Sequence, residues 1–479
     1  MVVETFNVMK ELFYCIKTIF VYRLHDTIQH MLYKTVPETL SLNIHQIISN
    51  TTHSSPIEIF NIIIISMISL SINWRNSLLT GYLCILIIFT VLHKITLLNM
   101  LIVCTISIFL IRNAFSTIKK PNEIMNINIQ RNHIFILRAG IMVLTVISIF
   151  MSNFENLWNN KFDKTVYKGI SLLDTGIPGF IFINAFCRNF SYNNLFNKKI
   201  ISLIVFGIFQ FIINMGLKWY IKIEKKNNYL NFYFMLAIYD ILYNLYKKIF
   251  NLFYLFDTII AITMLLIWYN IININYVLND KGYLWFTQNK EELYSIVPHM
   301  AFFLIISDFG RIYEKIQFKY TLSLAYFIGI LLIYIKSVAI YKEISLTKKN
   351  ILIILNDDIV EYVSKKTSNL FYILWSLLVC FFSFVVTFTI CKFFPHSINN
   401  NTMVQFISDN LMFIFVCANI CTFILERYNV NMNYGQSILV NLVYLFIIFV
   451  ILGLIMKPYK YLNQKRTVPL YYRPKIKNY

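Results

Sequence analysis

The sequence predicts an all-α, polytopic integral membrane protein that crosses the bilayer about thirteen times. Hydrophobic residues make up 58% of the 479 residues and charged residues only 14%, whereas soluble chains carry roughly 25% charged residues. Apolar runs long enough to cross about 30 Å of hydrocarbon recur along most of the chain. Basic residues collect in the segments between these runs and in the tail. A soluble α/β enzyme with a large core would not explain this pattern.

The N-terminal extension, residues 1–56, has a mixed composition. Apolar positions in its segment KELFYCIKTIFVYRL recur at helical spacing beside Lys and Arg. This pattern favours an amphipathic helix at the membrane interface over a cleaved signal, because no long apolar run followed by small residues is present.

The multi-pass domain, residues 57–456, contains the apolar runs, and neither an internal repeat nor a soluble domain interrupts it. In chain order, the runs predict spans near 57–73, 78–93, 95–111, 134–150, 170–187, 199–220, 229–246, 249–270, 294–309, 319–340, 371–391, 405–425 and 437–456.

The tail, residues 457–479, carries seven basic residues and no acidic one. The positive-inside rule places it in the cytosol, and an odd number of spans then places the N-terminus in the lumen. The basic loop 113–133 agrees with this topology, whereas Lys222, Lys225 and Lys226 fall on the lumenal side against the rule. The net charge of +20 therefore indicates anionic lipid headgroups as partners, and no nucleic acid is expected.

Cysteine and histidine give no sign of a metal site. Most of the eight cysteines fall within apolar spans, and no Cys-x-x-Cys pair with histidine partners occurs. Histidine is nearly absent from the span interiors, with only His93 and His299 near span edges. We expect no metal, and we expect the cysteines to be small buried apolar side chains.

The segment KTVYKGISLLDTGIPGF, Lys164–Phe180, places a carboxylate inside an apolar run. An ionisable group within a span costs at least about 2.5–3.5 kcal/mol, so Asp174 needs a reason to be there. Gly176 and Pro178 follow and disfavour a regular helix. Two interpretations stand equal on these residues: a polar cavity lined by Asp174, or a helix-start carboxylate at the headgroup boundary.

The preceding loop, NFENLWNNKFDK, supplies Glu155, Asp163 and Lys164. A lysine near a carboxylate can orient it or neutralise negative charge that develops on a carbonyl oxygen. An ordinary solvated loop is the alternative interpretation.

Five blocks, in order along the chain, carry a family resemblance. The first, KTVYKGISLLDTGIPGFIF, is similar to the pattern K-T-E-x-Y-G-x-S-L-M-D-x-G-V-G-x-F-V-F. The other four are NFYF at Asn231–Phe234, NKEELYSIVP at Asn289–Pro298, SKKTSNLFYILW at Ser364–Trp375 and ANICTF at Ala418–Phe423. Together they resemble the glucosaminyl-phosphatidylinositol acyltransferase family of GPI-anchor biosynthesis, over roughly residues 45 to 455.

The resemblance implies an O-acyltransferase of the endoplasmic reticulum membrane. It would move a fatty acyl group from acyl-CoA, its co-substrate, to a hydroxyl of the inositol ring of glucosaminyl-phosphatidylinositol, with no tightly bound cofactor. Transfer would be direct between the bound substrates, because no activated serine or cysteine is visible. The leaflet of the chemistry stays open, since acyl-CoA is cytosolic and the topology places the Lys164 loop in the lumen.

The family's motifs assign the candidate catalytic residues. The general base would be Asp174, or a group of the segment Asn153–Glu155 folded over the site, with Glu155 as its carboxylate. Lys164 would orient the base or polarise the thioester carbonyl. Asn153 stands where the family carries an aspartate, so that carboxylate would instead come from Glu155 or Asp163. The residues expected to line the headgroup site are Asn231, Asn289, Lys290, Asn369 and Asn419.

A membrane transporter or lipid flippase is the alternative function, because such proteins also carry broken helices with intramembrane carboxylates. Their folds often contain related halves, and the chain shows none. Labelled acyl-CoA and glucosaminyl-phosphatidylinositol, given to the purified protein, discriminate the two, since a transporter leaves both unchanged.

Overall fold

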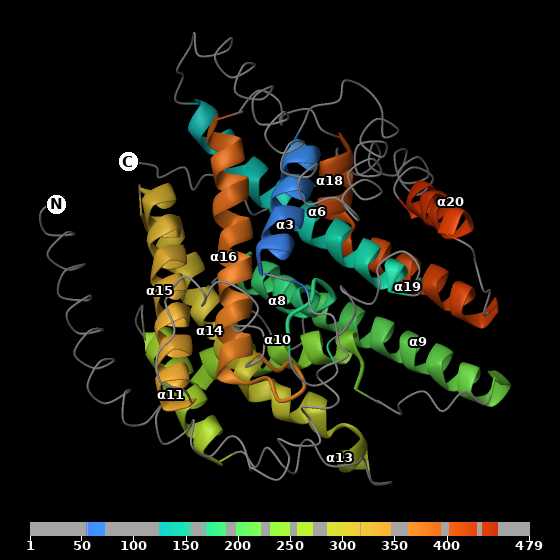
Figure 1. The fold of residues 1–479 in the computed structure, drawn as a ribbon, viewed down its shortest axis with the longest axis horizontal. Coiled ribbons are helices and arrows are strands. Elements are labelled where there is room, and N and C mark those ends of the chain that lie inside the picture. The colour runs from blue at the N-terminus through green and yellow to red at the C-terminus, as the bar shows by residue number, and fades with distance from the viewer. Residues whose placement is uncertain are drawn as a thin grey trace, which may run out of the picture.

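The described part of the computed structural model consists of helices and contains no β-strand, which confirms the all-α part of the predicted fold class (Figure 1). The structure describes residues 56–71, 124–152, 169–187, 198–221, 230–249, 256–271, 285–316, 318–345, 363–393, 402–428 and 434–448, together with Ser54, Phe154 and Thr165. The predicted spans 78–93 and 95–111, the tail 457–479 and nearly all of the extension 1–56 lie outside these residues.

Each of the other predicted spans overlaps a helix. The α-helices are α3 (Pro56–Ser71), α6 (Ile124–Met151), α8 (Gly176–Phe186), α9 (Lys198–Ile221), α10 (Phe232–Ile249), α11 (Phe256–Ile271), α13 (Trp285–Gln288), α14 (Lys290–Lys315), α15 (Lys319–Ser345), α16 (Leu370–Phe393), α18 (Thr402–Asp409), α19 (Leu411–Tyr428) and α20 (Tyr434–Phe446). A 3₁₀ turn, η1 (Leu173–Thr175), precedes α8.

Four of the described helices are long and apolar enough to cross a membrane. Their spanning segments are His133–Phe150 in α6, Lys290–Lys315 in α14, Lys319–Val338 in α15 and Leu370–Lys392 in α16. Six further apolar stretches are shorter, with 10–17 residues each. These helices support the membrane class, and the total of about thirteen spans stays a prediction.

The core of the molecule lies where α6, α8, α14 and α16 meet. The short helix α8 packs against α6, α14 and α16, so it lies among the longest helices (Figure 1). Aromatic rings fill the contact: Phe309 lies 4.8 Å from Phe381 and 5.5 Å from Phe384, between ring centroids, and Phe186 lies 5.0 Å from Phe384. These edge-to-face pairs fix the three helices relative to one another.

The close approach of α8 to α6 depends on a glycine. A Cβ atom at Gly179 would lie 2.8 Å from Cγ2 of Ile141 on α6, closer than carbon atoms pack. Only a residue without a side chain allows this contact. The glycine in the GIPGF sequence is therefore a packing residue that holds the start of α8 against the core.

The outer helices expose apolar side chains. On α9 these include Ile201, Val205, Ile208 and Ile212, each about half exposed. Only 33% of the spanning window of α15 is buried within the protein. In water such faces would be unfavourable, so this arrangement fits helices that contact lipid.

Candidate functional site

Asp174 lies at the start of α8, in the 3₁₀ turn η1. Its side chain is almost completely buried, with 4% of the residue exposed. The predicted interruption of the helix at Gly176 and Pro178 is wrong in detail. Both residues lie in the first turn of α8, where backbone N–H groups have no helical acceptor and proline is tolerated. Asp174 is thus a helix-start carboxylate, enclosed by the protein.

Two hydroxyl side chains hold one oxygen of the Asp174 carboxylate. Ser171 Oγ donates to Oδ2 at 2.9 Å and accepts the backbone N–H of Asp174 at 3.2 Å. Thr165 donates to the same oxygen through its Oγ1, at 2.8 Å, and through its backbone N–H, at 3.2 Å. Asp174 therefore fixes the chain at Thr165, directly after Lys164.

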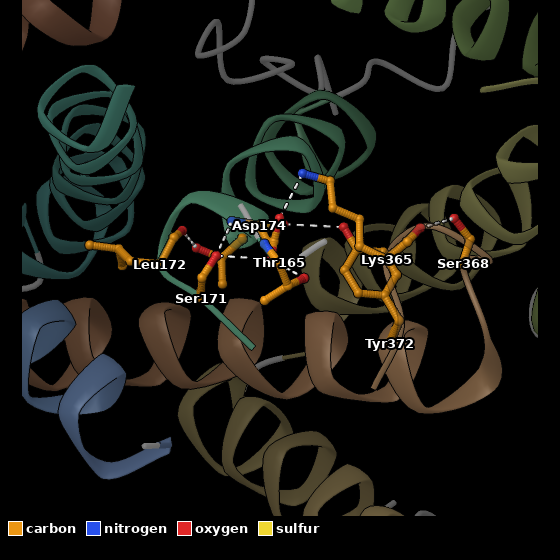
Figure 2. A network of polar contacts seen from close by, with 8 residues as sticks. Thr165, Ser171, Leu172, Asp174, Lys365, Ser368 and Tyr372 are labelled. Carbon is orange, nitrogen blue, oxygen red and sulfur yellow. Dashed lines mark hydrogen bonds and ion pairs between the residues drawn. The ribbon is translucent and has the colours of Figure 1, made fainter. Parts of the chain in front are cut away.

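Lys365 holds the other oxygen, from the turn that precedes α16 (Figure 2). Its Nζ lies 2.8 Å from Oδ1 of Asp174. The two chain segments also meet through backbone, since the N–H of Gly169 donates to the carbonyl of Val363 at 2.8 Å. Gly169 has a φ of 115°, a conformation that favours glycine. The apposition of the two segments thus brings Lys365 to Asp174.

The start of α16 adds a third contact. The hydroxyl of Tyr372 donates to the backbone carbonyl of Asp174 at 3.1 Å (Figure 2). Proline at position 178 cannot donate to this carbonyl, so the tyrosine takes the place of the missing helical N–H. Pro178, which suggested an opened helix in the sequence, instead leaves the carbonyl of Asp174 free to join α8 to α16 through Tyr372.

The donors around the Asp174 carboxylate are shared unevenly between its two oxygens, and Lys365 keeps unused donors. Oδ2 accepts three hydrogen bonds, two from Thr165 and one from Ser171, whereas Oδ1 accepts one, from Lys365, although each oxygen offers about two lone-pair sites. An ammonium group carries three donors, and one of those on Lys365 is used by Asp174. The Lys365 side chain is 20% exposed, so it can still donate to a ligand.

Two of the predicted headgroup residues cap helices. Asn231 Oδ1 accepts the N–H of Phe234 at 3.1 Å, at the start of α10. Asn369 Oδ1 accepts the N–H of Tyr372 at 2.9 Å, at the start of α16. Both are N-cap hydrogen bonds, in which a side chain satisfies a helical N–H that has no backbone acceptor. Their proposed role in headgroup binding stays a prediction.

The remaining predicted headgroup residues lie beside the same helix starts. Asn289 is buried before α14 and its Oδ1 accepts the N–H of Leu230 at 2.9 Å. Lys290 is buried at the first position of α14. Asn419, on α19, lies 3.5 Å from the hydroxyl of Tyr233 in the first turn of α10.

One ion pair joins these helix starts to the Asp174 group, which consists of Asp174 and the residues that contact it: Thr165, Ser171, Lys365 and Tyr372. Lys366 Nζ lies 3.8 Å from Glu291 on α14, next to the lysine that contacts Asp174. The structure thus gathers Asp174 and the predicted headgroup residues around the N-terminal ends of α8, α10, α14 and α16.

Three candidate catalytic residues, Asn153, Glu155 and Lys164, lie outside the described residues. Their roles stay predictions. Phe154 and Thr165, their neighbours in the chain, are described. Through Thr165, the peptide group that follows Lys164 is bonded to Asp174.

Sequence reasoning missed Lys365 and Tyr372. Asp174 and Lys365 are 191 positions apart, so no local spacing links them. The signal was present in the SKKTSNLFYILW block, which contains both residues. Only Asn369 was taken from that block.

A second buried group of charges lies on α10, α11 and α14. Asp257 pairs with Lys247 and Arg311, and Arg311 also lies 2.9 Å from Asp308. Thr258 donates to Asp308 through its backbone N–H at 2.6 Å and its Oγ1 at 2.8 Å. Two cations balance two fully enclosed carboxylates. Within the part of the chain that the structure describes, no three His, Cys, Asp or Glu residues are grouped to hold a metal ion.

Comparison with known proteins adds a family match to this geometry. A family model described as GWT1 matches residues 26–455. An uncharacterized protein of Arabidopsis thaliana is 25% identical over 376 residues, which cover 74% of this chain and 81% of that protein. The phosphatidylinositol-glycan biosynthesis class W protein of Dictyostelium discoideum is 22% identical over 392 residues, 70% of this chain and 76% of that protein.

Proposed function

The chain belongs to the GWT1 family, and we propose that it is an acyltransferase of GPI-anchor biosynthesis in the endoplasmic reticulum membrane. It would transfer a fatty acyl group from acyl-CoA to an inositol hydroxyl of glucosaminyl-phosphatidylinositol. The similarity to a phosphatidylinositol-glycan biosynthesis protein supports the pathway. The observation that carries the reaction is the buried pair of Asp174 and Lys365, where a cation with unused donors lies at the convergence of four helix starts.

Lys365 supplies what acyl transfer requires at the thioester. When the inositol oxygen attacks, negative charge develops on the carbonyl oxygen of the acyl group. An ammonium group held in a largely enclosed place stabilises that charge more strongly than water does. The unused N–H donors of Lys365 can reach such an oxygen. Lys164, which precedes Thr165 in the chain, would be the second donor.

Asp174 positions these donors. Its hydrogen bonds hold Lys365 and Thr165 in place. Oδ1, which accepts only from Lys365, keeps a lone-pair site, so Asp174 stays a candidate for the general base. Asn153 is an amide and does not take up a proton near neutral pH. The general base is therefore Asp174, Glu155 or another group near the pair.

The substrate headgroup fits the surroundings of the pair. Helix N-termini carry partial positive charge and attract phosphate, and α8, α10, α14 and α16 all begin in this region. Lys290 and Asn419 offer polar contacts to the sugar and inositol hydroxyls. The apolar outer faces of the helices would contact lipid. The acyl chain of acyl-CoA and the lipid part of glucosaminyl-phosphatidylinositol would both enter from the lipid.

The test is transfer by the purified full-length protein. Radiolabelled acyl-CoA and glucosaminyl-phosphatidylinositol are supplied in detergent micelles or vesicles, and the lipid product is separated and weighed by mass spectrometry. The expected product is glucosaminyl-phosphatidylinositol heavier by one acyl chain in ester linkage. Both substrates recovered unchanged, with lipid moved across the vesicle, would contradict the proposal and identify a transporter or flippase.

A further inference from the structure

His299 is a buried histidine that none of the roles above uses. It lies on α14, directly after Pro298, and is 4% exposed. The sequence placed it near the edge of a span, but α14 begins at Lys290, so His299 lies within the helix and is enclosed by neighbouring helices. A titratable side chain in such a place requires a partner or a function.

The hydrogen bonds of His299 define which nitrogen is free. Its Nδ1 lies 2.8 Å from the backbone carbonyl of Ser295. A carbonyl oxygen only accepts, so Nδ1 must carry the proton of this bond. The neutral imidazole then has its lone pair on Nε2. That atom is buried and has no hydrogen-bond partner in the structure.

The surroundings place this lone pair beside the Asp174 group. Tyr372, on α16, has its ring centroid 6.0 Å from that of His299, and its hydroxyl bonds the carbonyl of Asp174. Tyr239, on α10, flanks the imidazole from another side, with centroids 5.8 Å apart. Tyr372 thus contacts both the imidazole of His299 and the backbone of Asp174.

We propose that Nε2 of His299 is the general base for the hydroxyl that receives the acyl group. The inference rests on the proposed function and assigns the proton acceptor of that reaction. A general base needs an available lone pair within reach of the attacking hydroxyl. Asn153 is an amide, and the lone-pair site left on Asp174 lies on the oxygen that is ion-paired with Lys365, whereas Nε2 is an imidazole nitrogen held in one tautomer with no hydrogen-bond partner.

Nε2 takes the proton of the inositol hydroxyl while the oxygen of that hydroxyl forms a bond to the thioester carbon. Lys365 donates to the carbonyl oxygen as charge develops there. The bond between carbon and sulfur then breaks, the imidazolium returns the proton to the thiolate, and CoA leaves as the thiol. No oxidant, metal or covalent enzyme intermediate is required.

His133 offers a matched control, because it is also fully buried but packs elsewhere. Its ring lies 5.0 Å from each of Phe384 and Phe388, between centroids. Phe384 lies about 18 Å along α16 from Tyr372 at 1.5 Å per residue. Replacement of His133 therefore repeats the loss of a buried imidazole away from the proposed site.

The first test compares His299→Asn with His133→Asn in purified full-length protein. The asparagine amide can still donate to Ser295 but has no basic lone pair. General-base catalysis contributes about 10²–10⁴-fold, so His299→Asn should lower kcat at least about 100-fold with little change in KM for acyl-CoA. His133→Asn should keep the wild-type rate per folded molecule. A wild-type rate for His299→Asn would overturn the inference.

A second measurement uses only the wild-type protein, so it can be made even if His299→Asn does not fold. The acidic limb of the kcat/KM profile reports the base of the free enzyme. Ionisation of imidazolium absorbs heat, whereas that of a carboxylic acid is almost thermoneutral. We expect the limb to move to lower pH on warming; a limb that stays in place would assign the base to a carboxylate such as Glu155. Absence of any transfer by wild-type protein would instead overturn the proposed function.

Discussion

Two buried groups of charges in this protein have similar chemistry and different architecture. In the first, Asp174 meets Lys365 between loop segments at the starts of α8 and α16. In the second, Asp257 and Asp308 meet Arg311 and Lys247 between α10, α11 and α14. The second group is a network of two carboxylates and two cations shared by three helices, whereas the first is one carboxylate and one cation between loop segments.

This difference distinguishes a group of charges that can act on a substrate, the first, from a group that stabilises the fold, the second. Buried ion pairs contribute little net stability, but loss of one partner is costly. The second group therefore locks three helices together, and it contains none of the residues that the family resemblance assigns to the site. The first lies beside Nε2 of His299 and among four helix starts, so its unused groups can act on a ligand. The comparison predicts stability effects from one group and rate effects from the other.

The largest expected effect is on stability, from Arg311→Leu. The change leaves Asp257 and Asp308 enclosed with one cation, Lys247, between them. We expect a loss of about 3–5 kcal/mol in the free energy of unfolding, measured by thermal or denaturant unfolding in detergent. Lys336→Leu, which removes an exposed cation from α15, should change it by less than about 0.5 kcal/mol. Equal stability of Arg311→Leu and wild type would remove the distinction between the groups.

A large effect on rate is expected from Lys365→Met. Loss of one donor to a developing oxyanion lowers the rate about 10²–10³-fold, and the methionine keeps the length of the side chain. Acyl transfer per folded molecule is the measurement. Lys366→Met is the neighbouring control, because Lys366 pairs with Glu291 at 3.8 Å and should keep the wild-type rate. Similar losses of rate in both variants would mean that the rate depends on the positive charge of the segment and not on the contact of Lys365 with Asp174.

The smallest effect separates capping from headgroup binding at Asn369. Asn369→Ala removes the N-cap of α16 and should cost about 1 kcal/mol of stability. Asn369→Ser retains a capping oxygen and should restore it. The KM for glucosaminyl-phosphatidylinositol gives the second readout. If serine restores stability but KM stays raised, the amide binds the headgroup as the sequence predicts.

Composition and periodicity were sufficient for the fold class, because apolar runs of membrane length leave few alternatives. Local spacing was also sufficient to select Asp174 as an unusual carboxylate. Its partner could not be found this way, since Lys365 reaches it through contacts between segments far apart in the sequence, such as those of Gly169 with Val363 and of Tyr372 with Asp174. Long-range pairing depends on how loops meet, and no periodicity encodes it.

Breaks in helices were harder to predict than helices. The run 405–425 was expected to be one span, but it forms α18 and α19 with Asn410 between them. The Asn410 side chain donates to the carbonyl of Phe406 at 2.9 Å, and the Asn410 backbone N–H donates to the same carbonyl at 3.2 Å, so side chain and backbone share one acceptor at the break. Pro178 was expected to disturb a helix and instead lies in its first turn. In both cases the position of the residue within the helix decides the outcome.

The central claim is that the Asp174 group carries the chemistry and the Asp308 group carries the structure. Asp174→Asn and Asp308→Asn make the same change in the two groups. The direct measurement is the rate of acyl transfer from acyl-CoA to glucosaminyl-phosphatidylinositol per folded molecule, after size-exclusion chromatography in detergent. We predict at least about a 100-fold loss for Asp174→Asn and a wild-type rate, at a reduced yield of folded protein, for Asp308→Asn. A wild-type rate for Asp174→Asn would contradict the claim.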